Sequence, residues 1–279
     1  MNVSFAKMSG AGNTFVLIDN RDGVVEKAIA DAGTTLDAFV IRACSPVHGA
    51  ATDGLILIER ADGHDFAWRF FNRDGSHANM CGNGARCAAR FARLEGITED
   101  RAAFVTGAGV IRSQVVGERV RVSLTPPGPV TTDIQLTLGR RKVLAHQVDT
   151  GVPHLVIPVD DLNAVDVQTL GAEARFHKRF QPGGTNVNFV SEMGDGTLRV
   201  RTYERGVEGE TLACGTGVTA AALVYAHLGH VDSPVPVVPL SGERLAVYFT
   251  RRDGGFADVV IEGPAKLLFR GEFGPEALS

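Results

Sequence analysis

The chain has 279 residues, of which 44% are hydrophobic and 22% are charged, and its formal net charge is −4. This composition is typical of a globular protein long enough for two domains, and it excludes an intrinsically disordered chain. Acidic and basic residues are interleaved, so the sequence lacks the basic stripe of a protein that binds nucleic acid.

The N-terminus and the cysteines bear on location and redox state. The first ten residues lack the apolar core of a signal peptide, and no apolar run reaches membrane-spanning length. We therefore expect a cytoplasmic protein with no membrane partner. The four cysteines, Cys44, Cys81, Cys87 and Cys214, form no C-x-x-C pair and lack zinc-site spacing. Reduced thiols and no bound metal are expected.

Short runs of β-branched and aromatic residues, bounded by Gly, Pro, Asn or Asp, predict a chain rich in strands. In chain order, the predicted strands cover residues 15–19, 54–59, 66–71, 119–124, 154–159, 186–190, 198–203, 244–249 and 257–262. Helical patterns cover residues 36–44, 84–95, 169–180 and 217–228.

Two proline-containing stretches suggest where the domains divide. Thr-Pro-Pro-Gly-Pro at 125–129 is typical of a linker, because adjacent prolines cannot continue a strand. A Gly-Pro pair at 263–264 precedes a final segment that we expect to return to the first half of the chain. The predicted domains are residues 1–125 plus 265–279, and residues 126–264.

The sequence contains an internal repeat. TDGLILIE begins at Thr52, and TNVNFVSE begins 133 positions later, at Thr185 (185 − 52). MCGNGARCAARFA contains Cys81, and ACGTGVTAAALVYA contains Cys214, again 133 positions later (214 − 81). Equal spacing indicates a duplicated domain. Equivalent loops of such a pair can face each other across a cleft, so that the two thiols approach one bound molecule from opposite sides.

Both repeated cysteines precede a glycine-flanked helix start, where unpaired backbone N–H groups carry partial positive charge. Such groups can bind a carboxylate, and they lower a thiol pKa below the ordinary value of about 8.5. One thiolate could then remove the proton from a carbon beside a bound carboxylate, while the other thiol returns a proton to the opposite face. This chemistry inverts a stereocentre without a cofactor.

Structural alternatives exist for these cysteines. A single cysteine before Gly-x-Gly is more often a small core residue, and this is our interpretation of Cys44 and Cys87. The repeat favours a functional role for Cys81 and Cys214. Nucleotide binding is not expected, because GAGNTF and CGNGAR lack the Gly-Lys-Ser/Thr ending of a phosphate loop and do not form a dinucleotide fingerprint.

Four segments resemble the diaminopimelate epimerase family: KMSGAGNTF (7–15), FFNRDGSHANMCGNGARC (70–87), GTNVNFV (184–190) and YERGVEGETLACGTG (203–217). The resemblance implies an α+β fold of two pseudo-symmetric domains. Each is a mostly antiparallel sheet wrapped around a central helix, and the active site lies in the interdomain cleft. It also implies interconversion of LL- and meso-2,6-diaminopimelate without pyridoxal phosphate or another cofactor, on the route to lysine and peptidoglycan precursors.

The resemblance also implies residue roles. Cys81 and Cys214 match the catalytic acid/base thiols, and His154 and Glu204 match residues that tune their pKa values. The implied substrate-binding residues are Asn13, Asn72, Gly82, Asn83, Asn186, Glu204, Arg205, Gly215 and Thr216. Gly82-Asn83 and Gly215-Thr216 would hold the reacting carboxylate, and Arg205 can hold the distal one through two parallel hydrogen bonds.

By themselves, several of these residues have plainer interpretations. Arg205 could be a solvated charge at a strand end, and Asn13 and Asn72 could cap turns. A structural role for His154 has about the same weight as a functional one.

Two departures from the family pattern leave the substrate open. Val152 stands where the family commonly has asparagine before Pro-His, and Gly54 follows the acidic residue of the TDG turn. A racemase of another amino acid on the same fold is therefore the near alternative. A dithiol redox or metal-binding protein is the alternative of another class. A homodimer is one option for the assembly.

Overall fold

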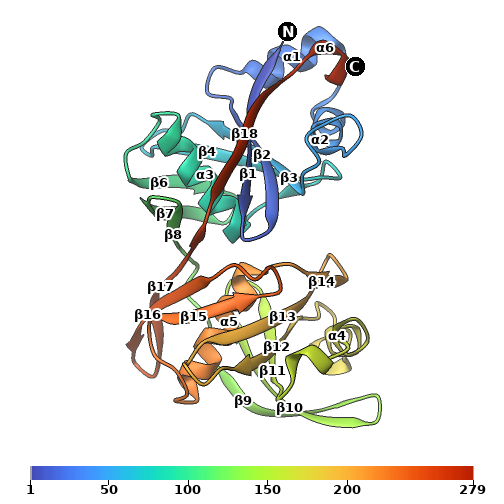
Figure 1. The fold of residues 1–279 in the computed structure, drawn as a ribbon, viewed down its shortest axis with the longest axis vertical. Helices are drawn as coiled ribbons and strands as arrows, with labels where there is room; N and C mark the ends of the chain where they lie inside the picture. Colours follow the sequence, from blue (N-terminus) through green and yellow to red (C-terminus); the bar gives the residue numbers. More distant parts are fainter. Residues whose placement is uncertain (1, 279) are drawn as a thin grey trace. The chain divides into compact units, whose positions relative to one another are not determined.

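The computed structural model describes residues 2–278, which form two compact units (Figure 1). Unit 1 comprises Met1–Val122 and Pro264–Ser279, and unit 2 comprises Ser123–Gly263. Strands outnumber helices in both units, so the predicted α+β class is confirmed. None of the described helices is long and apolar enough to cross a membrane.

Unit 1 is a mostly antiparallel sheet with four helices. Its strands are β1 (Val3–Gly10), β2 (Asn13–Asp19), β3 (Gly54–Glu59), β4 (Phe66–Asn72), β5 (His77–Ala78), β6 (Arg101–Thr106), β7 (Gly109–Val116), β8 (Arg119–Ser123) and β18 (Lys266–Phe273). Its helices are α1 (Val24–Ala32), α2 (Leu36–Cys44), α3 (Gly82–Leu94) and α6 (Pro275–Leu278).

The strands of unit 1 pair in the order β18–β1–β2–β3–β4–β6–β7–β8, and β5 pairs with β4. All pairs are antiparallel except β2–β3 and β4–β6. The pairing of β18 with β1 returns the end of the chain to its beginning, as the Gly-Pro pair predicted.

Unit 2 has the same kind of sheet. Its strands are β9 (Thr131–Leu138), β10 (Arg141–Asp149), β11 (Pro153–Pro158), β12 (Asn186–Glu192), β13 (Leu198–Glu204), β14 (Gly209–Thr211), β15 (Val235–Pro239), β16 (Leu245–Arg252) and β17 (Gly255–Pro264). Its helices are η1 (Leu162–Ala164), α4 (Val167–Arg175), η2 (Lys178–Phe180) and α5 (Gly215–His227).

The two units share one strand order, which supports the duplication. Unit 2 pairs in the order β9–β10–β11–β12–β13–β15–β16–β17, with β14 beside β13. Its parallel pairs, β11–β12 and β13–β15, fall at the same two places as in unit 1. Strand β18 is the first strand of the unit 1 order, as β9 is the first strand of the unit 2 order. The sheet of unit 1 therefore includes a strand from the C-terminal part of the chain.

Each sheet wraps around one central helix. In unit 1, α3 contacts β1, β2, β3 and β7, and in unit 2, α5 contacts β10, β11, β12, β13, β15 and β16. Helix-forming alanine is frequent in both segments, and nine of the 13 residues of α3 and ten of the 13 residues of α5 are buried. On the other face of the unit 1 sheet, Phe39 and Val40 of α2 and Val25 of α1 pack into an apolar core.

Small residues bring the first turn of each central helix directly onto its sheet. A Cβ atom on Gly10, at the end of β1, would lie 2.7 Å from the backbone oxygen of Asn83 and 3.1 Å from Sγ of Cys87. A Cβ atom on Gly217, in the first turn of α5, would lie 2.2 Å from Oδ1 of Asn188. At Gly10 the close atom is backbone, so a larger residue requires the helix to move; at Gly217 it is the side-chain oxygen of Asn188, so a larger residue requires that amide or the helix to move.

We predict that Gly10→Ala lowers the free energy of unfolding of unit 1 by about 1–3 kcal/mol, because the added methyl group forces helix and sheet apart. Urea unfolding followed by the fluorescence of Trp68, the one tryptophan of the chain, reports this unit. The control Ser9→Ala changes the neighbouring half-buried position of the same strand and should stay within about 0.5 kcal/mol of the parent. Equal midpoints for Gly10→Ala and the parent would contradict the close approach.

Candidate active site

Cys81 caps the N-terminus of α3. Its backbone is extended (φ −147°, ψ 119°), and its Sγ accepts a hydrogen bond from the backbone N–H of Gly84 at 3.5 Å. The thiol is half-buried. A sulfur in this position faces the positive end of the helix dipole, which favours the thiolate.

A chain of hydrogen bonds fixes two side-chain amides beside Cys81. Arg86 donates from Nη2 to Oδ1 of Asn83 at 2.7 Å, and Asn83 donates from Nδ2 to Oδ1 of Asn13 at 2.6 Å. A guanidinium can only donate, so Asn83 must turn its oxygen to Arg86 and its NH₂ group to Asn13. Asn13 in turn keeps its own NH₂ group as a donor for a ligand.

Arg86 is a site residue that sequence reasoning missed. It is 0% exposed, and it also donates to the backbone oxygens of Gly82 and Pro264, each at 3.4 Å. Burial lowers the pKa of its guanidinium, and no carboxylate within residues 2–278 pairs with it. The signal in the sequence was an arginine at the fifth position after Cys81, inside a run of small and apolar residues.

Asn72 lies at the end of β4 and holds a turn. Its Nδ2 donates to Oγ of Ser76 at 2.9 Å, and its backbone N–H donates to the backbone oxygen of Ser76 at 2.9 Å. Asn72 is paired with Gly54, where a Cβ atom would lie 2.6 Å from the backbone oxygen of Phe71. The glycine at 54 therefore follows from packing, and no side chain fits there.

Cys214 caps the N-terminus of α5 in unit 2. Its backbone is extended (φ −107°, ψ 109°), and its Sγ lies 3.4 Å from Oγ1 of Thr216. Thr150 donates to the backbone oxygen of Thr216 at 3.2 Å, which ties the first turn of α5 to the residue after β10. Cys214 therefore repeats the placement of Cys81 within its own unit.

Polar side chains share the face of the unit 2 sheet that α5 covers. His154 is paired with Asn186, and Asn188 is paired with Thr202, two residues before Glu204. Paired residues, and residues two apart on a strand, point to the same face of a sheet. The side chains of His154, Asn186, Asn188, Thr202 and Glu204 therefore lie on one face. The close approach of Gly217 to Asn188 places the first turn of α5 on this face.

A hydrogen bond connects two predicted site residues, Asn186 and Arg205. Asn186 accepts from the backbone N–H of Arg205 at 2.8 Å and donates to the backbone oxygen of Pro153 at 3.2 Å. It therefore links the start of the His154 strand to the end of β13. The guanidinium of Arg205 donates from Nη1 to the backbone oxygen of Gly183 at 3.4 Å and pairs with no carboxylate among the described residues.

Burial shifts the pKa values of both His154 and Glu204. His154 is 0% exposed, and its burial lowers its pKa to about 3, helped by the positive charge of Arg205. Burial also raises the pKa of Glu204, while Thr211 acts in the opposite direction. At neutral pH His154 is therefore a neutral imidazole.

The equivalent face of unit 1 is mostly apolar, with Asn72 as its polar member. Phe15 is opposite Gly54 as His154 is opposite Asn186, and Ile56 is opposite Phe70 as Asn188 is opposite Thr202. Strand β3 therefore matches β12 at a spacing of 132 positions (186 − 54), one fewer than the 133 that the sequence repeat predicted, whereas the two cysteines keep the spacing of 133. A Cβ atom on Gly84 would lie 3.1 Å from Cδ1 of Ile56, which repeats the contact of Gly217 with Asn188. The two helix starts therefore rest on chemically different surfaces.

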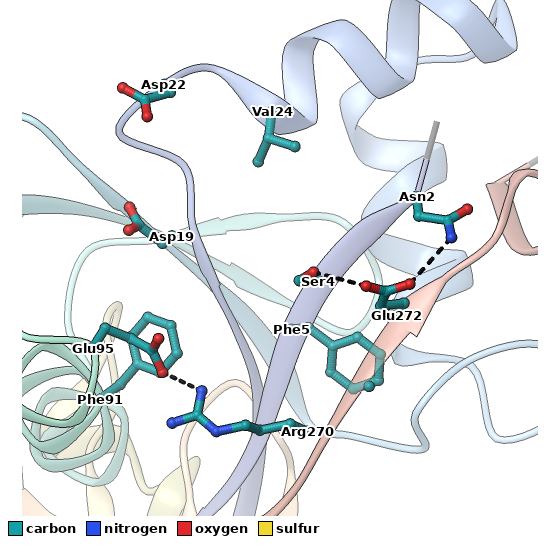
Figure 2. A pocket seen from close by; sticks show the side chains of 11 residues that line it. Asn2, Ser4, Phe5, Asp19, Asp22, Val24, Phe91, Glu95, Arg270 and Glu272 are labelled. Carbon is teal, nitrogen blue, oxygen red and sulfur yellow. Dashed lines mark hydrogen bonds and ion pairs between the residues drawn. The ribbon is translucent and has the colours of Figure 1, made fainter.

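The cavity shown in Figure 2 lies elsewhere in unit 1. It has a volume of about 540 Å³ and is lined by residues that include Asp19, Phe91 and Arg270. Glu272 accepts from Asn2 at 3.1 Å and from Ser4 at 3.3 Å, and Arg270 pairs with Glu95 (Figure 2). None of the predicted site residues lines this cavity.

The other two cysteines are core residues, as predicted. Burial raises the pKa of Cys44 to about 11 and the pKa of Cys87 to about 12. Across residues 2–278, no group of three or more His, Cys, Asp or Glu side chains is arranged to hold a metal ion.

Comparison with known proteins finds relatives along nearly the whole chain. The family described as diaminopimelate epimerase matches residues 5–130 and 146–268. The chain is 46% identical over 281 residues to a diaminopimelate epimerase of Aquifex aeolicus (strain VF5), covering 99% of both proteins. It is 43% identical over 271 residues to one of Hydrogenobaculum sp. (strain Y04AAS1), covering 95% of this chain and 96% of the relative.

Two solved structures share the fold at low sequence identity. A Bacillus anthracis phenazine biosynthesis protein of the PhzF family gives a TM-score of 0.71 at 14% identity, over 98% of this chain and 99% of its own. A probable proline racemase from Agrobacterium radiobacter K84 gives a TM-score of 0.71 at 16% identity, over 99% of this chain and 96% of its own.

We predict that iodoacetamide at about pH 8 alkylates Cys81 and spares Cys44 and Cys87. Their raised pKa values keep both core thiols protonated until the pH approaches about 11 and about 12, so low thiolate content alone slows them at least ~100-fold relative to a free cysteine. Peptide mapping by mass spectrometry gives the order of labelling, and labelling in urea, where all four thiols react, is the control. Labelling of Cys87 as fast as Cys81 would contradict the assignment.

Proposed function

The chain belongs to the diaminopimelate epimerase family, and from this premise we propose that it interconverts LL- and meso-2,6-diaminopimelate without a cofactor. It is thus an isomerase of amino-acid biosynthesis that acts on a small molecule. The observation that carries the proposal is a cysteine at the N-cap of both central helices, in a chain that is 46% identical to a named epimerase over nearly its full length.

In the proposed reaction, Cys81 and Cys214 act as an acid/base pair on one carbon. The thiolate of one takes the Cα proton, so that a C–H bond breaks and an S–H bond forms. The electron pair moves into the substrate carboxylate. The thiol of the other cysteine then gives its proton to the opposite face of the carbon, which completes inversion and leaves the two sulfurs with exchanged protonation.

The proposed binding groups stabilise the negative charge that develops on the carboxylate. Backbone N–H groups of Gly82-Asn83 and Gly215-Thr216 lie at the helix N-termini, where N–H groups bind anions. For this reaction, the lobes 1–125 plus 265–279 and 126–264 must present both thiols to one carbon.

Asn13, Asn72, Asn186, Glu204 and Arg205 are the proposed contacts to the rest of the substrate. Arg205 suits the distal carboxylate, because no described carboxylate occupies its guanidinium. The fixed amide of Asn13 offers an NH₂ donor. Asn186 already uses its oxygen and one N–H within the protein, so it can offer only its second N–H and its remaining acceptor capacity.

A racemase of another amino acid is the second candidate, and Val152 is the observation that favours it. A valine side chain cannot supply the amide that the family commonly has before Pro-His. Gly54 does not add to this argument, because packing against Phe71 already explains it. Deuterium uptake at Cα across a panel of amino acids separates the two candidates, and the proposal expects diaminopimelate to exchange fastest.

A cytoplasmic location and a homodimeric assembly stay predictions. Cell fractionation tests the first, and analytical ultracentrifugation tests the second.

We predict that Cys81→Ala and Cys214→Ala each reduce kcat for epimerisation by on the order of 10²–10⁴-fold, the usual contribution of a general acid or base. Racemisation of LL-diaminopimelate is followed together with solvent hydrogen exchange at Cα. Cys44→Ala removes a thiol from the core instead and should keep kcat within about threefold of the parent while lowering stability. Full turnover in either of the first two variants would refute the acid/base roles.

We predict that Arg205→Lys raises KM for diaminopimelate by about 10–100-fold, because the ammonium group cannot form two parallel hydrogen bonds with a carboxylate. Arg199→Lys on β13, the strand that ends one residue before Arg205, is the matched control, since Arg199 donates to Asn163 and has no proposed contact with substrate. Steady-state kinetics of both variants give the two KM values for diaminopimelate. An unchanged KM for Arg205→Lys would exclude it as the distal carboxylate contact.

A further inference from the structure

Asn188 is a fully buried amide on β12 whose three polar partners are all buried with it. Its Nδ2 lies 2.9 Å from the backbone oxygen of Leu155 and 3.1 Å from Nδ1 of His154. Its Oδ1 lies 2.9 Å from Oγ1 of Thr202. The amide therefore joins β11, β12 and β13 beneath the first turn of α5.

The partners of Asn188 fix which end of the amide faces which group. A backbone carbonyl oxygen only accepts hydrogen bonds, so the NH₂ group must face Leu155. The hydroxyl of Thr202 can donate, and it donates to the remaining oxygen. Turning the amide around would bring two oxygens together at Leu155, which costs a buried hydrogen bond and adds repulsion.

This orientation determines the tautomer of His154. The second N–H of the same NH₂ group points to Nδ1 of His154, and a nitrogen that accepts a hydrogen bond carries no proton. A neutral imidazole holds one proton, so that proton is on Nε2. Burial, which lowers the pKa of His154 to about 3, keeps the ring neutral, and Arg205 is the charge that acts in the same direction.

Nε2 of His154 is buried and has no hydrogen-bond partner among the described residues. A buried donor without a partner costs free energy, and groups of this kind occur where a ligand or a reacting group completes the contact. The neighbouring charged side chains are Glu204, on the same face of the sheet, and Arg205.

We propose that Asn188 is a positioning residue that holds His154 as the neutral Nε2–H imidazole, so that His154 acts in the reaction as a hydrogen-bond donor to an anion and not as a base. This inference rests on the proposed epimerase function for its role in catalysis, although the position of the proton follows from the geometry alone. Phe15 and Ile56 take the places of His154 and Asn188 in unit 1, so among the described residues the sheet beneath α3 holds no such imidazole at the equivalent position.

The direct test is ¹⁵N-correlation NMR of the full chain, with His154→Gln used to assign the resonances of His154 among the eight histidines. The expected spectrum has a protonated Nε2 and an unprotonated Nδ1, unchanged between about pH 5 and about pH 8, a range that spans the ordinary histidine pKa. A proton on Nδ1, or a charged ring in this range, would overturn the proposal. The measurement needs neither substrate nor a folded variant of Asn188.

Two substitutions separate positioning from a merely structural role. Asn188→Asp replaces the donor by a carboxylate that accepts, so Nδ1 of His154 should become protonated and kcat should fall by about tenfold or more with a smaller change in KM. Thr202→Val is the control, because Leu155 still orients the amide and the Nε2–H form should remain. A folded Asn188→Asp protein whose Nδ1 is still unprotonated, or a changed tautomer in Thr202→Val, would overturn the assignment.

Two anions of the reaction could accept from Nε2: the thiolate of Cys214 and the carboxylate of the substrate. A shifted Nε2 resonance in substrate-free Cys214→Ala would support the thiolate, and a shift that needs meso-diaminopimelate would support the carboxylate. No response to either change would overturn the donor role. A parent chain that shows the Nε2–H tautomer and no epimerisation would overturn the proposed function while leaving the assigned proton in place.

Discussion

The contact between the first turn of a helix and the sheet beneath it determines the rest of this structure. Both central helices begin at a cysteine with extended backbone, and both carry glycine where helix and sheet meet, Gly84 in unit 1 and Gly217 in unit 2. The close approach fixes the direction of the helix N-terminus, and with it the backbone N–H groups that face an anion. The backbone N–H groups at the helix N-terminus therefore stabilise the thiolate form of a cysteine at the N-cap.

Duplication supplied this arrangement twice, and later divergence made the two copies different. The strand order and the places of the parallel pairs are the same in both units. Beneath α3, however, the sheet presents Phe15 and Ile56, and beneath α5 it presents His154 and Asn188 at the equivalent positions. In each direction of the epimerisation, one thiol must start protonated and the other deprotonated. The different surroundings of Cys81 and Cys214 are consistent with such unequal protonation before substrate binds.

Local signals made part of the fold predictable. Helix α2 has the predicted bounds, 36–44, because Thr35 caps it with its side chain; helix α1 was missed because Gly23, at its N-cap, makes no side-chain cap. Strand β3 is a continuous apolar run and was predicted, whereas β18 is mostly exposed and is stabilised by its pairing with β1 at the far end of the chain. Within the candidate site, Cys81 and Cys214 were predicted from the sequence because they repeat. Arg86 and Asn188 were missed because their roles depend on burial and strand register, which no short motif encodes.

The central claim is that two different groups handle the proton on the two faces of one carbon. The most direct test is to start the reaction from one unlabelled stereoisomer of diaminopimelate in D₂O and to analyse both isomers by mass spectrometry at early turnover. Two separate acid/base groups predict that the newly formed isomer carries one deuterium at Cα while the remaining starting isomer carries none. Deuterium appearing in both isomers at equal rates, or a product that retains the original hydrogen, would contradict the account.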